Sequence, residues 1–203
     1  MINNYKDFKK YLETLSDKPK LLIHACCGPC STHTLSLLEK YFDITVFYDN
    51  SNIDTIEEFE KRYLELEKVV NHFNTIKLVK SHYNSKTYYD AIKGYERDGE
   101  FSKRCYLCMK LRLKNSFEYA KENGFDLFTT TLSISPYKNS DWINEIGNDL
   151  AKDSTSTKFL YSNFKKEEGY KNSIKMSIDL NLYRQHYCGC VYSKQELKEK
   201  AHG

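Results

Sequence analysis

The hydrophobic pattern of the chain changes repeatedly between the two spacings that are typical of strands and of helices. Short β-rich runs bounded by polar residues or glycine predict strands at residues 20–24, 43–48, 75–79, 126–131 and 158–161. Apolar residues three and four positions apart predict helices at residues 5–15, 31–41, 55–73, 88–93, 103–123, 139–152 and 170–180, and after Tyr192. This alternation predicts an α/β fold with a mostly parallel central sheet flanked by helices.

A length of 203 residues suits one domain, and no Gly/Ser-rich linker divides the chain. We expect residues 1–18 to form an N-terminal helical extension and residues 19–203 to form a single α/β catalytic domain. Ser31 is expected to cap the helix that follows the first strand. Because ligands of parallel sheets bind beyond the carboxyl ends of the strands, the pattern points to residues 25–30 and 132–138 as candidate site loops.

The composition is that of a soluble globular protein, with 40% hydrophobic and 29% charged residues. No apolar run approaches the roughly 18 residues of a membrane-spanning helix, and the first residues lack the apolar core of a signal peptide. We therefore expect a cytoplasmic protein without a membrane partner. The net charge of +3 is too small to identify a nucleic-acid-binding protein by itself.

The cysteines change this picture, because all seven fall into three tight groups. The groups are Cys26, Cys27 and Cys30; Cys105 and Cys108; and Cys188 and Cys190. An odd number of cysteines in a chain without secretory features argues against a structural disulfide framework. Cysteines used only as small core residues would not gather in this way. The grouping therefore indicates thiolates that converge on one metal or redox centre.

Each group has the spacing of a metal-binding or redox element. Adjacent cysteines share a metal only on irregular backbone, which Gly28 and Pro29 supply, and the N-terminus of the following helix lowers thiol pKa values. The Cys-x-x-Cys pair shares one helical face, and the Cys-Gly-Cys segment suits a strained disulfide or bidentate metal binding. A closed zinc site or a four-iron cluster takes four protein ligands. We therefore favour an iron–sulfur centre with an additional redox element over zinc alone.

Other polar residues carry two interpretations each. His24 is either a donor beside the cysteine loop or a strand histidine whose ring is satisfied by the backbone. The polar segment 133–138 is not required by apolar packing and suits an oxygen-rich ligand. The helix that carries Lys103, Arg104 and Arg112 either meets phosphates or presents a solvated face.

Five segments together resemble the epoxyqueuosine reductases of the QueH type. They are Ile23-His24-Ala25-Cys26-Cys27-Gly28-Pro29-Cys30-Ser31; Asn50-Ser51-Asn52-Ile53; Arg104-Cys105-Tyr106-Leu107-Cys108 with Arg112-Leu113; Thr129-Thr130-Thr131-Leu132-Ser133-Ile134-Ser135-Pro136-Tyr137-Lys138; and Gly169-Tyr170 with Leu182-Tyr183-Arg184-Gln185-His186-Tyr187-Cys188-Gly189-Cys190. Ser51, Thr55 and Met109 depart from the family pattern. These departures concern loop geometry more than chemistry, because they lie outside the cysteines.

The resemblance implies a Rossmann-like domain similar to the nucleotide alpha hydrolase (HUP) architecture. It implies a cobalamin-independent oxidoreductase that converts epoxyqueuosine to queuosine at the wobble position of tRNA with a GUN anticodon. The implied cofactor is a [4Fe-4S] cluster bound by Cys26, Cys27, Cys105 and Cys108. The implied role of Cys188 and Cys190 is a redox-active pair, with a second, mononuclear iron as the alternative, which Cys30 would help to bind. The electron donor is not identified by the sequence.

The reaction also needs a proton donor and contacts to RNA. The candidate donors are Tyr137, Lys138, His24 and Tyr187. The predicted RNA contacts are Lys103, Arg104, Arg112 and Arg184. The wobble base is expected to leave its stack and to lie on tyrosine or arginine planes.

Three other functions remain open from the residues. A zinc-stabilised RNA-binding module would use four thiolates and carry no redox chemistry. An ATP-dependent tRNA-thiolating enzyme would share the sheet and the cysteines, but the loop after the first strand lacks the Ser-Gly-Gly phosphate cradle of that class. A thiol–disulfide reductase would use Cys188 and Cys190 and would tolerate loss of Cys26 and Cys27.

Overall fold

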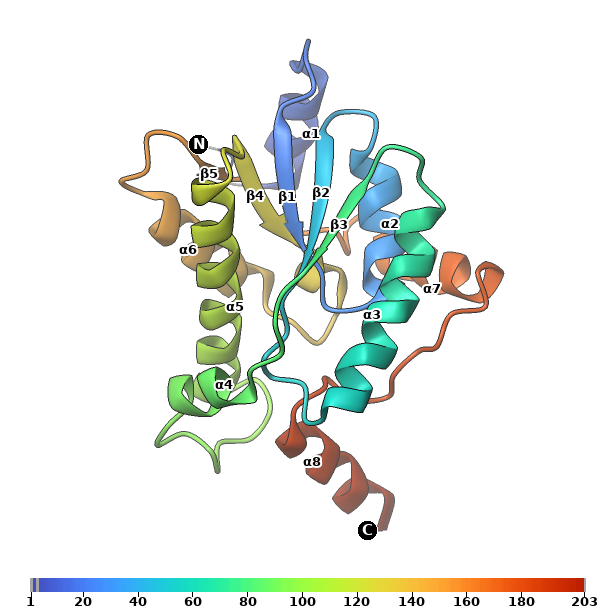
Figure 1. The fold of residues 1–203 in the computed structure, drawn as a ribbon, viewed down its shortest axis with the longest axis vertical. Coiled ribbons are helices and arrows are strands. Elements are labelled where there is room, and N and C mark those ends of the chain that lie inside the picture. Colours follow the sequence, from blue (N-terminus) through green and yellow to red (C-terminus); the bar gives the residue numbers. More distant parts are fainter. Residues whose placement is uncertain (1, 3, 203) are drawn as a thin grey trace.

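The computed structural model describes residue 2 and residues 4–202, and this part of the chain contains a five-stranded sheet (Figure 1). All of its strand pairs are parallel, and the strand order is β3-β2-β1-β4-β5. The strands are β1 (Lys20–His24), β2 (Asp43–Tyr48), β3 (Lys77–Lys80), β4 (Leu127–Thr130) and β5 (Lys158–Phe159). The predicted α/β fold with a parallel sheet is therefore confirmed. The predicted domain limits at residues 1 and 203 lie outside the described residues.

Helices connect the strands and follow the last one. They are α1 (Tyr5–Glu13), α2 (Gly28–Leu38), α3 (Ile56–Asn71), α4 (Ser85–Ala91), α5 (Lys103–Glu122), α6 (Ser140–Ala151), α7 (Gly169–Asp179) and α8 (Val191–His202), with a 3₁₀ turn η1 (Thr131–Ile134) after β4. Helix α4 begins three residues before its predicted start because the Asn84 side chain caps it. Within the described residues, none of these helices combines the length and the apolar character needed to cross a membrane.

Side chains of the central strand β1 alternate between two apolar cores, because successive residues of a strand point to opposite faces. Leu21 and Ile23 pack with residues of α1, α2 and α3, whereas Leu22 packs with residues of α5 and α6. Figure 1 shows these two sets of helices on opposite faces of the sheet. Burial on both faces explains why the middle of β1, Leu21-Leu22-Ile23, is entirely hydrophobic.

Helix α1 packs against the same core as β1. Phe8 and Leu12 are buried there, and the Phe8 ring lies edge-on to the Phe164 ring with centroids 6.0 Å apart. The helix is amphipathic, with its polar side chains directed outward. Helix α1, which lies within the predicted extension, is therefore closely packed on the α/β domain.

Helix α2 begins at Gly28, three residues before the predicted start. Cys27 has an extended backbone (φ −173°) and is the N-cap residue, and Pro29 lies in the first turn, where its missing N–H costs no hydrogen bond. The prediction that Ser31 caps this helix is therefore wrong. Ser31 lies inside the helix, where its hydroxyl donates to the Cys27 carbonyl at 2.8 Å. Consequently, Cys30 belongs to the first helical turn and not to a loop.

Gly28 allows α2 to approach the backbone of α3. A Cβ atom at this position would lie 2.5 Å from the backbone oxygen of Glu65, which cannot move aside alone. We expect Gly28→Ala to lower the free energy of unfolding by about 1–3 kcal/mol, the usual cost of overpacking, as measured by urea denaturation. Gly99→Ala is the matched control, because nothing lies within 4 Å of its added Cβ. Equal losses of stability in the two variants would contradict the expected clash.

The central position of β1 determines where a ligand can bind. The chain passes from β1 to β2 on one side and returns to pair β4 on the other side of β1. A position in the sheet where the chain changes direction in this way is called a switch point. In open α/β sheets, ligands usually bind in the crevice at the carboxyl ends of the strands at this point. The segment from Cys26 to Cys30 lies at this end of β1, and η1 follows β4 beside it.

Candidate functional site

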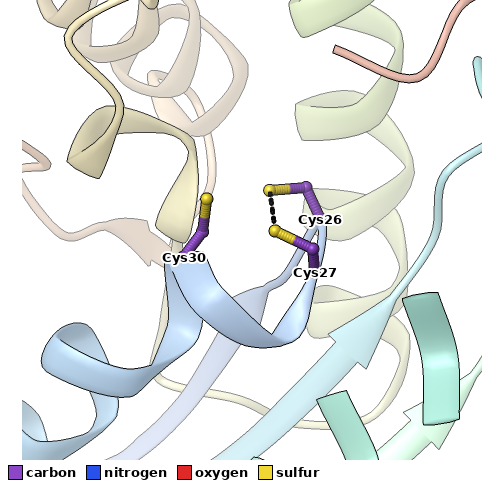
Figure 2. A group of neighbouring side chains, drawn as sticks. All are labelled: Cys26, Cys27 and Cys30. Carbon is purple, nitrogen blue, oxygen red and sulfur yellow. Dashed lines mark hydrogen bonds between the residues drawn. The ribbon is translucent and has the colours of Figure 1, made fainter. Parts of the chain in front are cut away.

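Three thiols from one short segment meet at the carboxyl end of β1. Cys26 follows the strand, Cys27 caps α2 and Cys30 lies in the first helical turn, and their sulfur atoms all lie within 4.8 Å of one another (Figure 2). We call these three residues the thiol trio. The Cys26 and Cys27 sulfur atoms are 3.6 Å apart. This separation allows the three thiols to bind one metal ion or one cluster.

Hydrogen bonds within the thiol trio favour a thiolate at Cys27. The neighbouring Cys26 and Cys30 thiols hold the pKa of Cys27 well below the usual range, and the Gln185 amide, 3.0 Å from the Cys27 sulfur, adds to this effect. The same contacts, together with burial, raise the pKa of Cys30 well above its usual value. The thiolate is the form that binds metals, so the lowered pKa of Cys27 favours the binding of a cation.

The two other cysteine groups lie at the same cavity as the thiol trio. This cavity has a volume of about 400 Å³, and six of the seven cysteines line it: Cys26, Cys30, Cys105, Cys108, Cys188 and Cys190. None of the seven cysteines forms a disulfide. The structure thus brings the three groups to one cavity. Within the described part of the chain, however, the thiol trio is the only group of three or more such side chains whose ligand atoms lie close enough to share a metal ion.

Cys108 and Cys190 occupy an apolar corner of this cavity. Both are buried and pack with Tyr88 and Ile92. Burial raises the pKa of Cys108 to about 11. In the absence of a metal, this thiol therefore stays protonated at neutral pH.

Lys138 forms a close contact with Cys188 at the same cavity. The ammonium nitrogen lies 3.0 Å from the Cys188 sulfur. Burial opposes both charges, but the attraction outweighs it: the pKa of Lys138 is raised, and the Lys138 and Arg112 charges lower the pKa of Cys188. The contact between the two side chains therefore favours their charged forms, an ammonium and a thiolate. Tyr137, the preceding residue, is 66% exposed at the cavity rim.

Charged residues hold the loop that carries Cys188 and Cys190. Asp54 precedes α3, and Glu58 and Arg62 lie in this helix. Arg62 is buried, pairs with Glu58 at 2.7 Å and donates to the Cys188 carbonyl at 3.0 Å. The backbone N–H of Asp54 donates to the Gly189 carbonyl at 2.9 Å. The Asp54 carboxylate also accepts the Tyr187 hydroxyl at 2.9 Å. The position of this loop therefore depends on a buried cation and not on a disulfide.

Gly189 has two reasons to be glycine. Its φ is +123°, and an added Cβ would lie 2.9 Å from Arg62 Nη1. We expect Gly189→Ala to lower the free energy of unfolding by about 1–3 kcal/mol because it combines backbone strain with the displaced guanidinium. Gly94→Ala, at φ +87° with nothing near the added Cβ, is the control and should cost about 1 kcal/mol. Thermal unfolding checks the order, and an equal or larger loss for the Gly94 variant would contradict it.

His24 does not lie at the cavity. Its ring is fully buried in the sheet, with Nδ1 2.8 Å from the Thr130 hydroxyl and Nε2 donating to the Asp49 carbonyl at 3.0 Å. Burial, with a contribution from the Arg112 charge, lowers the pKa of His24 to about 4. This placement disfavours the predicted proton-donor role of His24, because the ring is neutral, buried and hydrogen-bonded at both nitrogens.

Two of the predicted RNA contacts also lie in the interior. Arg104 and Arg112 are buried in the cavity wall and not on a solvent-facing surface of α5. Arg104 pairs with Glu196 at 2.8 Å. This burial disfavours their predicted contact with RNA phosphates. Lys103, which is exposed, and Arg184, which is half-buried at the cavity, stay predictions.

Two residues that the sequence patterns did not single out contact the cysteine-bearing segments. Gln185 contacts the thiol trio, and Arg62 holds the C-terminal cysteine loop. The sequence spacing does indicate that Arg62 is buried. Arg62 lies three residues after Phe59 and four before Leu66, so it shares their buried helical face. For Gln185, only its place in the segment before Cys188 offered a signal.

Comparison with known proteins identifies the family. A family model described as epoxyqueuosine reductase QueH matches residues 21–196. The epoxyqueuosine reductase QueH of Streptococcus pyogenes serotype M1 is 41% identical over 189 residues, which cover 91% of this chain and 74% of that protein. The one from Thermotoga maritima is 37% identical over 183 residues, which cover 89% of this chain and 93% of that protein.

A solved structure of a different activity shares the fold. The U34-tRNA thiolase NcsA from Methanococcus maripaludis, solved with its [4Fe-4S] cluster, matches with a TM-score of 0.53 and 14% identity over 96% of this chain and 71% of that chain. Identity this low supports the predicted architecture alone. The family match and the close relatives go further, and they establish that this chain belongs to the epoxyqueuosine reductase QueH family.

Proposed function

We propose that this protein reduces epoxyqueuosine to queuosine at the wobble position of tRNA with a GUN anticodon, the last step of queuosine biosynthesis. The observation that carries the proposal is the thiol trio at a cavity that the two other cysteine groups also line, in a chain of the QueH family. The proposed compartment is the cytoplasm, where tRNA is modified.

The overall chemistry sets what the site must supply. Removing the epoxide oxygen breaks two C–O bonds, forms a C=C bond and releases the oxygen as water, which consumes two electrons and two protons. Amino-acid side chains do not provide electrons at a low enough potential, so a bound cofactor must do so. We propose a [4Fe-4S] cluster as the source of these electrons, reduced in turn by a donor that is not part of this chain.

The residues present fit such a cluster. The donor set consists of thiols, the preferred ligands of iron–sulfur clusters, and the thiol trio brings three of them within 4.8 Å of one another. Cys26 and Cys27 belong both to the predicted ligand set and to the trio. Cys30, Cys105 and Cys108 are the candidates for the remaining positions. Cys188 and Cys190 are proposed as a redox-active pair, and a second, mononuclear iron at the remaining thiols is the alternative.

Lys138 is the proposed proton donor. Its ammonium lines the cavity and stays protonated because the Cys188 thiolate raises its pKa. An oxygen that leaves an opened epoxide is a stronger base than an amine, so transfer from the ammonium is favourable. Tyr187 is less suited, since its hydroxyl is engaged by Asp54 and its pKa is raised by burial and by this contact.

The cavity wall suits an extruded base. Aromatic side chains at the cavity include Phe101, Tyr137, Trp142, Tyr170 and Tyr187. Proteins that act on single nucleotides of folded RNA stack the unstacked base on aromatic or guanidinium planes. We propose that these side chains, together with Arg184, receive the wobble nucleotide.

The other functions considered from the sequence differ in what they require. A zinc-stabilised RNA-binding module would use the thiol trio but leave the ammonium–thiolate pair of Lys138 and Cys188 without a role. The tRNA thiolase neighbour shares the fold at 14% identity, whereas named reductases match at 37–41%. The reductase assignment therefore has the stronger support.

The decisive experiment uses anaerobically purified protein with reconstituted iron and sulfide. Incubation with tRNA that carries epoxyqueuosine, in the presence of a chemical reductant, should convert this nucleoside to one lighter by a single oxygen, as measured by mass spectrometry of the digest. The same protein loaded with zinc is the control and should give no conversion. Unchanged epoxyqueuosine with the fully iron-loaded protein, or equal conversion with the zinc form, would exclude the proposed function.

A further inference from the structure

Arg112 is a buried cation without a carboxylate partner. It is 2% exposed in the middle of α5, and no ion pair is formed by it among the described residues. Its one hydrogen bond runs from Nη1 to the Asn50 side-chain oxygen at 3.2 Å. The Nε and Nη2 groups are buried without any hydrogen-bond partner. Such a group is strongly destabilising unless a negative charge compensates it.

The two other buried arginines of the site do not share this property. Arg62 pairs with Glu58 at 2.7 Å, and Arg104 pairs with Glu196 at 2.8 Å. Each of these guanidiniums therefore has a permanent carboxylate counter-charge. The missing partner is specific to Arg112.

The groups that face Arg112 are mainly thiols. Arg112 lines the cavity together with six of the cysteines, and the Cys108, Cys188 and Cys26 sulfurs, followed by the Asp49 carboxylate, are the groups that raise its pKa. The Asp49 oxygens already accept hydrogen bonds from Ser81 and from Asn115, each at 2.7 Å. Arg112 therefore shares the cavity with all three cysteine groups, and the hydrogen bonds of the Asp49 carboxylate go to other residues than Arg112.

Asn50 links this cation to the thiol trio. Its side-chain oxygen accepts from Arg112, and its side-chain nitrogen donates to the Ala25 carbonyl at 2.9 Å, directly before Cys26. Asn50 is itself buried. The guanidinium is thus fixed relative to the backbone that carries the thiols.

We propose that Arg112 is the counter-cation of the sulfur-bound redox centre and raises its reduction potential. A fixed positive charge beside a cluster stabilises the reduced form, which carries one more negative charge, over the oxidised form. The inference rests on the proposed function, because it requires that these thiols hold a redox-active iron–sulfur centre. Arg112 acts on that centre through its charge and is a positioning and tuning residue.

The test is a potentiometric titration of the reconstituted protein, followed by electron paramagnetic resonance, without tRNA or turnover. We expect Arg112→Gln to lower the ratio of reduced to oxidised centre at least tenfold at a fixed potential, which is 59 mV for a one-electron couple. Arg112→Lys keeps the positive charge, so its reduction potential should stay close to that of the wild-type protein. Lys110→Gln removes an exposed charge from the same helix and should leave the potential unchanged.

A second variant keeps the test decisive if Arg112→Gln does not fold or does not bind iron. Asn50→Asp places a carboxylate against the same guanidinium with little change of shape, and it should lower the potential in the same direction. Equal potentials in the wild-type and Asn50→Asp proteins, or a shift in Lys110→Gln as large as in Arg112→Gln, would overturn the inference and leave the reductase function standing. A wild-type protein that binds no redox-active iron would overturn both.

Discussion

Replacement of Lys138 by glutamine is expected to lower epoxyqueuosine turnover by about 100-fold or more, the usual range for loss of a general acid. Lys138 lies at the cavity with its ammonium 3.0 Å from the Cys188 sulfur, and it is charged at neutral pH. Glutamine keeps a polar side chain that can form hydrogen bonds, but it supplies no acidic proton. Single-turnover conversion, measured with saturating reductant, separates this step from electron delivery.

Lys138→Arg distinguishes proton donation from charge. Arginine keeps a positive charge next to Cys188, but its guanidinium does not release a proton at accessible pH. Turnover should therefore stay low in this variant if Lys138 donates the proton, and recover if only its charge matters. Lys166→Gln, an exposed substitution near the same loop, should behave as the wild-type protein. Turnover of Lys138→Gln within a few-fold of wild type would assign the proton to another group.

Replacement of Cys27 by serine is expected to remove bound iron and to lower turnover by more than about 100-fold. Loss of an outer contact to a metal ligand typically costs 10- to 100-fold in affinity or activity, and Cys27 is the thiol of the trio with the lowered pKa. A serine hydroxyl does not ionise at neutral pH and cannot replace the thiolate. Iron and sulfide content, with the visible absorbance of the centre, give the readout.

The fold provides an internal control for this substitution. The Cys27 side chain makes no capping hydrogen bond to α2, and serine is a favourable N-cap residue. The metal-free variant should therefore unfold at the same urea concentration as the metal-free wild type, or at a slightly higher one. Gln185→Leu removes only the contact to the Cys27 sulfur and should show an intermediate loss of iron. Wild-type iron content in Cys27→Ser would exclude Cys27 as a ligand.

The sequence predicted the architecture well where local pattern and packing agree. Strands β1 and β2 have their predicted ends, because both are buried on two faces and their hydrophobic runs are uninterrupted. The grouping of cysteines predicted that distant segments meet, and the cavity at the switch point brings them together. The start of α2 was missed because Gly28 and Pro29 also signal a loop, and a change of three residues moved Cys30 into a helix.

Buried charge was the least predictable feature. A lysine or arginine on a helix is normally solvated, so Arg104 and Arg112 were interpreted as surface contacts, although both are buried. Their charged neighbours include residues far along the chain, Glu196 for Arg104 and Cys188 and Cys26 for Arg112. No local pattern contains that information. His24 was uncertain for the same reason, since its two hydrogen-bond partners follow other strands.

The two apolar cores on either face of the sheet have a consequence for the life of the enzyme. They are built from leucine, isoleucine, valine and phenylalanine side chains of β1, β2, β4 and the flanking helices, and none of this packing depends on a cofactor. Small zinc domains, by contrast, unfold when they lose their metal. A cluster destroyed by oxygen would therefore leave behind an intact scaffold, and the cell could restore the enzyme by delivering fresh iron and sulfide without synthesising a new polypeptide.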